Sequence, residues 1–206
     1  MVGSSRFWVC VVFFVLGTCQ GATNIQSGDE VYLQNDSCTL HRGWIKCTTL
    51  PFNKCSTQKE DWSSLTIMKE DGTDIMHGDL VALRHAKGKW LDCNHTSFKC
   101  EIEQVHDGDV GGDTWTSSTQ QHFIIKNKLG FGHISDGQKI FLEYVWETGH
   151  CMRPSESLII GNQIVTDACN ENIITGFCDP WLITLETPTI PTAGPTTAPP
   201  SNEAYP

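Results

Sequence analysis

Apolar residues alternate with other residues in three short segments of similar sequence, at residues 28–33, 78–83 and 137–142. Each segment begins with a glycine and carries two branched apolar residues two positions apart: Val31 and Leu33, Val81 and Leu83, and Ile140 and Leu142. A period of two places both residues on one face of a β-strand. Gly-Asp or Asp-Gly at the start of each run predicts a turn, because glycine tolerates positive φ and Asp can bond its own backbone.

Each segment starts a longer repeat of about 50 residues, with origins at Gly28, Gly78 and Gly137 and an end near Glu186. In the first two copies a Trp, a branched apolar residue, a spacer and a Cys follow, at residues 44–47 and 90–93. Every copy closes on a further apolar run, at residues 62–67, 123–125 and 181–185. No stretch of about 12 residues shows helical period and caps, so we expect an all-β fold.

Three copies that can each bury only one face favour a closed arrangement in which every copy donates strands to a shared barrel. The Gly-Asp-x-Val-x-Leu start, the Trp-Leu-x-Cys middle and the aromatic-x-Ile close resemble the three lobes of a β-trefoil. Residues 78–93 are most similar to the MIR and fascin-like branches of that superfamily. The resemblance covers the whole expected domain, residues 22–186, and implies a β-trefoil.

The two ends of the chain differ in composition from this domain. Arg6, the apolar run at residues 7–16 and the small residues near Gly21 predict a secretory signal peptide at residues 1–21. The apolar run is too short for a membrane-spanning helix, which needs about 20 apolar residues. Residues 187–206 are rich in Thr and Pro, so we expect an extended tail outside any sheet. An O-glycosylated stalk and a bare disordered tail both fit this composition.

The charge balance limits the class of partner. The chain carries a formal charge of −10, and loss of the leader with Arg6 makes it −11. An acidic protein repels nucleic acid and anionic lipid. No segment after the leader is apolar enough to cross a bilayer, so we expect a secreted, extracellular protein with neither nucleic-acid binding nor membrane insertion.

Eight cysteines remain after the leader is removed, and an even set in an exported chain predicts four disulfides. Free or metal-binding thiols are the alternative, although no Cys-x-x-Cys pair is present. Cysteines at equivalent positions of the first two copies predict one short disulfide in each. The full set of expected pairs is Cys47 with Cys55, Cys93 with Cys100, Cys151 with Cys169, and Cys38 with Cys178.

One polar stretch has the residues of a calcium loop. Asp107, Asp109 and Asp113 lie among glycines in the insertion that lengthens the second copy. Carboxylates so spaced can supply oxygen ligands to Ca²⁺. Ser118 stands where an EF-hand needs its last Glu, so a solvated acidic loop is the preferred interpretation of the stretch. We therefore expect no cofactor, with Ca²⁺ as the weaker alternative.

Two tryptophans fall outside the repeat pattern. Trp44, Trp62, Trp90 and Trp181 occupy repeat-equivalent positions, where packing is the expected use. Trp115 and Trp146 have no such equivalents and are candidate surface residues for stacking on a ligand such as a sugar ring. The Gln-x-Trp signature of ricin-type lectins is absent.

Catalytic patterns are missing from the sequence. The chain has no Gly-x-Ser-x-Gly, no His-Glu-x-x-His and no phosphate-binding glycine loop followed by Lys. Its eight histidines lack the spacing of a zinc site on a helix. Glu101 and Glu103 are the sole weak indication of hydrolytic work. We expect no enzymatic activity.

Two Asn-x-Ser/Thr sequons, at Asn35 and Asn94, predict N-glycosylation of an exported chain. The function that fits best is a non-enzymatic binding protein for extracellular glycans or glycoproteins. A structural component of a mineralised or mucous matrix is the first alternative. In such a protein the acidic charge and the Thr/Pro-rich tail would matter more for function than a binding pocket. A trefoil-type protease inhibitor is the second, with residues 48–54 as its only candidate loop.

Overall fold

A computed structural model describes residues 22–35, 43–49, 53–86, 88–94, 96–103, 119–155, 163–168 and 180–189. Several predicted features lie outside the described residues: Asp107, Asp109, Asp113, Trp115, Cys38, Cys169, Cys178, the leader and residues 190–206. Within the described ranges the elements are β1 (Glu30–Asn35), β2 (Gly43–Thr48), β3 (Lys54–Gln58), β4 (Leu65–Met68), β5 (Leu80–His85), β6 (Trp90–Cys93), β7 (Cys100–Glu103), η1 (Thr119–Gln121), β8 (His122–Asn127), β9 (Gln138–Tyr144), β10 (His150–Pro154), β11 (Ile164–Ala168) and β12 (Trp181–Thr184).

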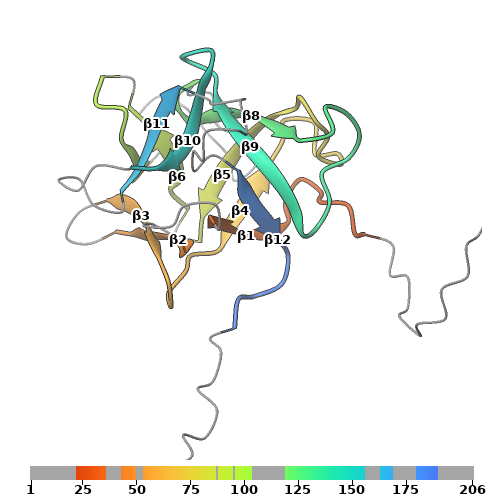
Figure 1. Cartoon of the computed structure of the whole chain (residues 1–206), viewed down its shortest axis with the longest axis horizontal. Helices are drawn as coiled ribbons and strands as arrows, with labels where there is room; N and C mark the ends of the chain where they lie inside the picture. The colour runs from red at the N-terminus through yellow and green to blue at the C-terminus, as the bar shows by residue number, and fades with distance from the viewer. Residues whose placement is uncertain are drawn as a thin grey trace, which may run out of the picture.

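Six of these strands close a ring of antiparallel pairs, in the order β1, β4, β5, β8, β9, β12 and back to β1. The other six form three hairpins, β2 with β3, β6 with β7, and β10 with β11. The hairpin strands gather on the left of Figure 1, beside the ring. The all-β prediction is confirmed, and the closed barrel with its hairpins fits a β-trefoil. We call strands β1–β4, β5–β8 and β9–β12 the first, second and third lobes.

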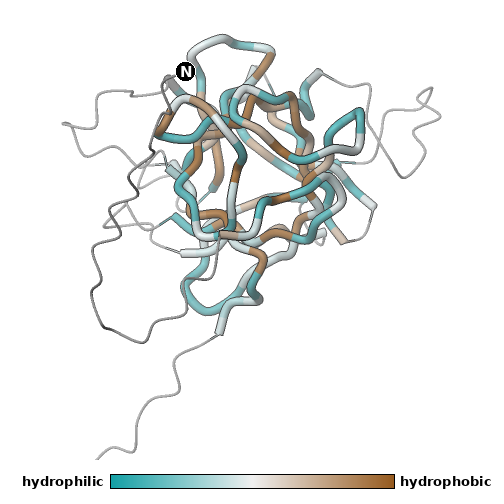
Figure 2. The backbone as a smooth tube through the Cα atoms, turned by 90° about the vertical axis from the view of Figure 1, so that its right-hand side faces the viewer, coloured by the Kyte–Doolittle hydropathy of each residue, from teal (hydrophilic) through white to brown (hydrophobic). Residues whose placement is uncertain are grey.

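The apolar positions of the ring strands point into one shared core. Val31, Val81 and Ile140 occupy equivalent positions in the first strands of the three lobes, and each is 0% exposed. Hydrophobic stretches, drawn brown in Figure 2, lie along the strands that surround the centre of the molecule. Trp90 and Trp181 are also buried, as their repeat positions predicted, and the indole Nε1 of Trp181 donates to the Met152 carbonyl at 2.7 Å.

Three isoleucines close one end of the barrel. The backbone amide of Ile25 donates to the Ile134 carbonyl (2.9 Å), Ile75 donates to Ile25 (2.9 Å) and Ile134 donates to Ile75 (2.8 Å). All three side chains are 0% exposed. Each isoleucine stands three residues before the glycine of its repeat, so the repeated unit begins earlier than the glycine.

The turn between each isoleucine and its strand is built alike in all three lobes. Its glycine has positive φ, 98° at Gly28, 89° at Gly78 and 74° at Gly137. The next side chain accepts a hydrogen bond from a backbone amide three residues before it: Asp29 from Gln26 (2.8 Å), Asp79 from Met76 (2.7 Å) and Gln138 from Ser135 (3.1 Å). Glycine and Asp therefore act in the turn as the sequence predicted.

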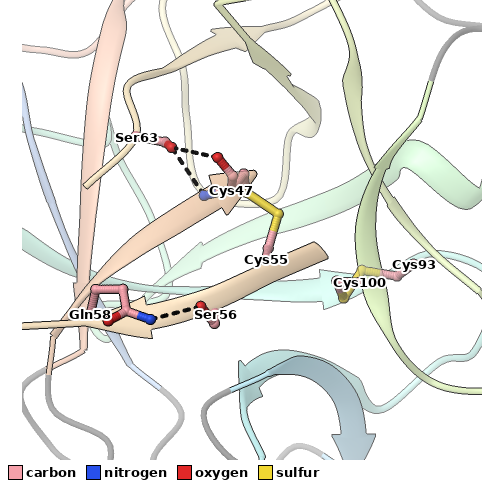
Figure 3. Close-up of a disulfide and its surroundings, with 7 residues drawn as sticks. All are labelled: Cys47, Cys55, Ser56, Gln58, Ser63, Cys93 and Cys100. Atoms are coloured by element: carbon pink, nitrogen blue, oxygen red, sulfur yellow. Dashed lines mark hydrogen bonds between the residues drawn. A yellow bond between two sulfur atoms is a disulfide. The ribbon is translucent and has the colours of Figure 1, made fainter. Parts of the chain in front are cut away.

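Two hairpins each carry a disulfide between facing strands (Figure 3). Cys47 is bonded to Cys55 with a Cα–Cα distance of 4.1 Å, and Cys93 to Cys100 with 4.0 Å. These are the two short pairings expected from the repeats. Cys151 is also disulfide-bonded.

The packed chain continues beyond Glu186, where the sequence placed the end of the domain. The hydroxyls of Tyr32 and Thr187 lie 3.3 Å apart, and Pro188 is buried. The first residues of the Thr/Pro segment therefore lie against the barrel, although they add no strand to it.

Candidate functional site

Trp146 is the predicted site residue that the structure places on the surface. It lies in the turn that joins β9 to β10, and 53% of its surface is exposed. The equivalent turn of the second lobe, between β5 and β6, is built with Ala86, Gly88 and Lys89 instead. The fold thus makes the equivalent connection of the second lobe without a tryptophan, which leaves the half-exposed Trp146 as a candidate for a role beyond this turn.

An acid and an imidazole follow Trp146 in the same connection. Glu147 Oε1 lies 3.4 Å from His150 Nε2, and the His150 amide donates to the Glu147 carbonyl at 3.0 Å. The His150 ring faces Phe98 of the second lobe, with ring centroids 5.8 Å apart and a tilt of 36°. We call Phe98, Trp146, Glu147 and His150 the aromatic patch.

Phe98 has an unusual backbone conformation. Its φ is +57°, and it is the one non-glycine residue of the described chain with positive φ. The conformation is held from both sides, since the Phe98 amide donates to Asn94 (2.8 Å) and its carbonyl accepts from Thr166 of β11 (2.7 Å). A bulky residue in the left-handed region costs about 1–3 kcal/mol, so its presence marks a functional candidate. The ring remains 38% exposed.

The barrel holds the Trp146 turn at both ends. Glu143 of β9 accepts a hydrogen bond from the Gly149 amide at 2.9 Å and pairs with Lys126 of β8. The Val145 amide donates to the His122 carbonyl at 3.3 Å. Burial alone would raise the pKa of the Glu143 carboxyl, but the Lys126 ammonium and the Gly149 amide outweigh burial and hold that pKa below its ordinary value.

A second link joins the turn to the Cys93–Cys100 hairpin. The Tyr144 phenol donates to the Cys93 carbonyl. Burial, followed by the negative charges of Asp92 and Glu147, raises the pKa of Tyr144, so the phenol stays neutral and keeps its proton for this bond. The third lobe and the β6–β7 hairpin, which carries Phe98 beyond Cys93, are thereby fixed relative to each other.

These groups have complementary chemistry. An exposed indole offers a flat apolar face, which suits the C–H face of a sugar ring, while a carboxylate accepts hydrogen bonds from hydroxyls. The described residues include no group of three or more His, Cys, Asp or Glu side chains placed to hold a metal ion. Glu101 and Glu103, on β7, are both half-buried.

The two sequons lie in different surroundings. Asn94 is exposed, and its side-chain oxygen accepts from the amides of Thr96 (2.8 Å) and Ser97 (2.9 Å), in a turn that directs the chain into Phe98. Asn35 is 0% exposed at the end of β1, opposite Gly43. A glycan needs a solvent-exposed amide nitrogen, so the structure is compatible with the Asn94 prediction and does not fit the one at Asn35.

Sequence reasoning missed Phe98, Glu143 and His150. Glu143 alternates with the core residues of β9, and only the fold turns its carboxylate toward Gly149. Phe98 follows the Asn94 sequon, and the equivalent loop of the first copy also carries a phenylalanine, Phe52, so the sequence alone does not single Phe98 out. The predicted inhibitor loop, 48–54, begins and ends on facing residues of β2 and β3, and residues 50–52 are outside the described chain.

No protein-family model and no curated protein matches this chain. Solved structures do match. The SDF2-like protein from Arabidopsis thaliana has a TM-score of 0.52 at 17% identity, covering 79% of this chain and 95% of that one. A Caenorhabditis elegans protein of unknown function has a TM-score of 0.55 at 14% identity, covering 82% and 98%. Lysenin in complex with phosphocholine has a TM-score of 0.54 at 7% identity, covering 82% of this chain and 48% of lysenin. At these identities the likeness concerns the fold.

Proposed function

We propose that this chain is a secreted, non-enzymatic binding protein that recognises extracellular glycans or glycoproteins through the aromatic patch. The observation that carries the proposal is the half-exposed Trp146, which the Glu147–His150 pair follows along the chain, in a turn that the second lobe builds without an aromatic residue. Tryptophan is enriched at binding interfaces, because its ring is apolar while its N–H can still form a hydrogen bond.

The geometry around Trp146 supports binding rather than transformation. The patch is fixed by Glu143, by the Tyr144 phenol and by the Phe98 backbone, so little ordering entropy is lost when a ligand arrives. The Glu147 carboxylate is 41% exposed in this connection and can accept hydrogen bonds from sugar hydroxyls. The complex of lysenin with phosphocholine is consistent with a binding role for proteins of similar fold.

The disulfides support passage through an oxidising compartment. We extend the proposal to a β-trefoil with four disulfides, in which Cys151 pairs with Cys169 and Cys38 with Cys178. Ca²⁺ binding by Asp107, Asp109 and Asp113, and glycosylation at Asn94, stay predictions.

A glycan array probed with the mature protein tests the proposal. We expect signals on a subset of glycans, competition by the corresponding free sugar, and loss of these signals in Trp146→Ala. Lys89→Ala, in the equivalent turn of the second lobe, is the matched control and should keep them. Absence of signal above background, or equal signals from Trp146→Ala, would reject recognition through this patch. Adsorption that free sugar does not block and that salt removes would favour the matrix alternative.

A further inference from the structure

A second exposed apolar feature lies away from the aromatic patch, in the turn that follows β8. Leu129 is 66% exposed and Phe131 is 71% exposed, and they are the two most exposed large apolar residues of the described chain. Lys128 precedes them and is itself exposed. We call Lys128, Leu129 and Phe131 the tip.

The first lobe shows that the fold does not need apolar residues here. In that lobe the Gly72 amide donates to the Lys69 carbonyl at 3.1 Å, and in the second lobe the Gly130 amide donates to Asn127 at 3.3 Å. This equivalence aligns Glu70 and Asp71 with the residues Lys128 and Leu129 of the tip. The first lobe therefore has two acidic residues where the second lobe has Lys128 and Leu129. Phe131 follows directly after Gly130, the glycine equivalent to Gly72.

The tip is held rigidly by Asn127, whose side chain is buried. Its Nδ2 donates to the Phe131 carbonyl (3.0 Å), and its Oδ1 accepts from the Gly130 amide (2.9 Å). Its backbone amide donates to His77 Nδ1 (3.0 Å), while the His77 amide donates to the Gly132 carbonyl (2.8 Å). Leu129 and Phe131 therefore stay exposed in a fixed turn and do not fold back onto the barrel.

The area of the tip argues against a stable protein interface. A buried Phe covers about 150–250 Å², and even with Leu129 added the tip stays well below the roughly 800 Å² per partner of a stable complex. Met76 pairs with His133 next to the turn and is 40% exposed, so it adds only a modest apolar area to that of the tip. The feature is also a convex turn, which a protein partner could receive only in a matching groove.

We propose that the tip is a peripheral membrane contact that enters the headgroup region of a zwitterionic, phosphocholine-type bilayer. A fluid interface accepts a convex apolar turn, and Leu and Phe there remove their surface from water. Lys128 has no ion pair among the described residues. Its ammonium is therefore available to a lipid phosphate when Leu129 and Phe131 enter the bilayer. The formal charge of −10 disfavours anionic lipid and selects neutral surfaces.

This contact differs from the membrane insertion that the sequence analysis did not expect. That expectation concerned a segment able to cross a bilayer. In the described part of the chain, no helix has the length and apolarity to do so. The proposed contact needs two side chains. Because removal of each from water is worth about a factor of ten in partitioning, the interaction is weak and reversible.

Co-sedimentation of the mature protein with phosphatidylcholine vesicles tests the proposal. Leu129→Glu/Phe131→Asp gives the turn the acidic character of the first lobe, and it should lower the partition coefficient about 100-fold. Trp146→Ala should leave partitioning unchanged, which separates this contact from the proposed glycan site. Circular dichroism of each variant confirms that it is folded.

A second readout comes from Phe131→Trp, whose emission should shift to the blue when phosphatidylcholine vesicles are added, relative to the wild-type protein. Failure of the wild-type protein to sediment with vesicles, or equal sedimentation of the double variant, overturns the proposal. So does a concentration-dependent dimer in analytical ultracentrifugation that the double variant abolishes, because the tip would then be a contact between copies. Stronger binding to phosphatidylserine than to phosphatidylcholine contradicts the assigned lipid class.

Discussion

The carboxylate of Glu143 and the amide of Gly149 are joined by a 2.9 Å hydrogen bond. Glu143 belongs to a barrel strand and is 6% exposed, whereas Gly149 ends the turn that presents Trp146. The ion pair with Lys126 holds the carboxylate from the opposite side. The core of the barrel thus determines where the aromatic patch stands, and its contribution can be measured.

Replacement of Glu143 by Gln should lower the free energy of unfolding by about 1–2 kcal/mol, because Lys126 loses its partner and the Gly149 amide loses a charged acceptor. Urea unfolding of the mature protein measures this change. Glu70→Gln, an exposed carboxylate of the first lobe, is the control and should change stability by less than about 0.5 kcal/mol. Equal effects of the two variants would show that the Glu143 network is not stabilising.

Acid should remove the same stabilisation. The folded pKa of Glu143 lies below the ordinary value of 4.5, so its contribution is fully present above pH 4.5 and is lost as the pH falls through the folded pKa. The stability difference between wild type and Glu143→Gln should therefore be constant from pH 7 to about pH 5.5 and shrink toward pH 3. A difference that grows on acidification would contradict the assigned direction of the pKa shift.

Gly43 should tolerate no side chain. A Cβ at this position would lie 2.3 Å from the backbone oxygen of Gln58 and 2.6 Å from its carbonyl carbon, and backbone atoms within a paired hairpin cannot move aside cheaply. Gly43→Ala should cost about 3 kcal/mol. Gly72→Ala is the matched comparison, because its φ is +68° with open space around it, and should cost about 1 kcal/mol. Thermal unfolding that ranks Gly72→Ala as the worse variant would be evidence against this packing.

The Cys93–Cys100 disulfide should stabilise the domain by limiting the unfolded chain. For a loop with a sequence separation of 7, the chain-entropy model gives about 2.5 kcal/mol. The double variant Cys93→Ala/Cys100→Ala should lose about that amount in urea unfolding under oxidising conditions. Since the hairpin presents Phe98, we also expect weaker glycan binding by this variant at unchanged net charge. Unaltered stability would mean that the β6–β7 hairpin is already restricted in the unfolded state.

Glycosylation should distinguish the two sequons. Expression through a secretory pathway should add a glycan at exposed Asn94, so that glycosidase treatment lowers the mass of the wild-type protein but not of Asn94→Gln. Asn35→Gln should leave the glycan mass unchanged, because the Asn35 side chain is 0% exposed. A glycosidase-sensitive mass in Asn94→Gln would show that Asn35 is modified before β1 packs.

Local pattern was sufficient for the strands and insufficient for the site. Val81 and Leu83, two positions apart, predict a strand with one buried face from local sequence alone, and both side chains are buried. Glu143 shows no such signal, because its role arises when β8 brings Lys126 to it. Phe98 likewise owes its conformation to Thr166, a residue of another lobe. The sequon predicts a glycan at Asn35, yet the fold buries the Asn35 side chain at the end of β1.

The ring of Ile25, Ile75 and Ile134 has a consequence for synthesis of the protein. Ile25 donates to Ile134, so the first copy cannot complete this end of the barrel until the third copy has been translated. At about 5–20 residues per second, that delay is roughly 5 to 20 seconds for a nascent chain. Throughout it, the first strand lacks its partner β12, and its edge can pair with another chain. The period of translation is therefore a stage at which the unpaired first strand is exposed to aggregation.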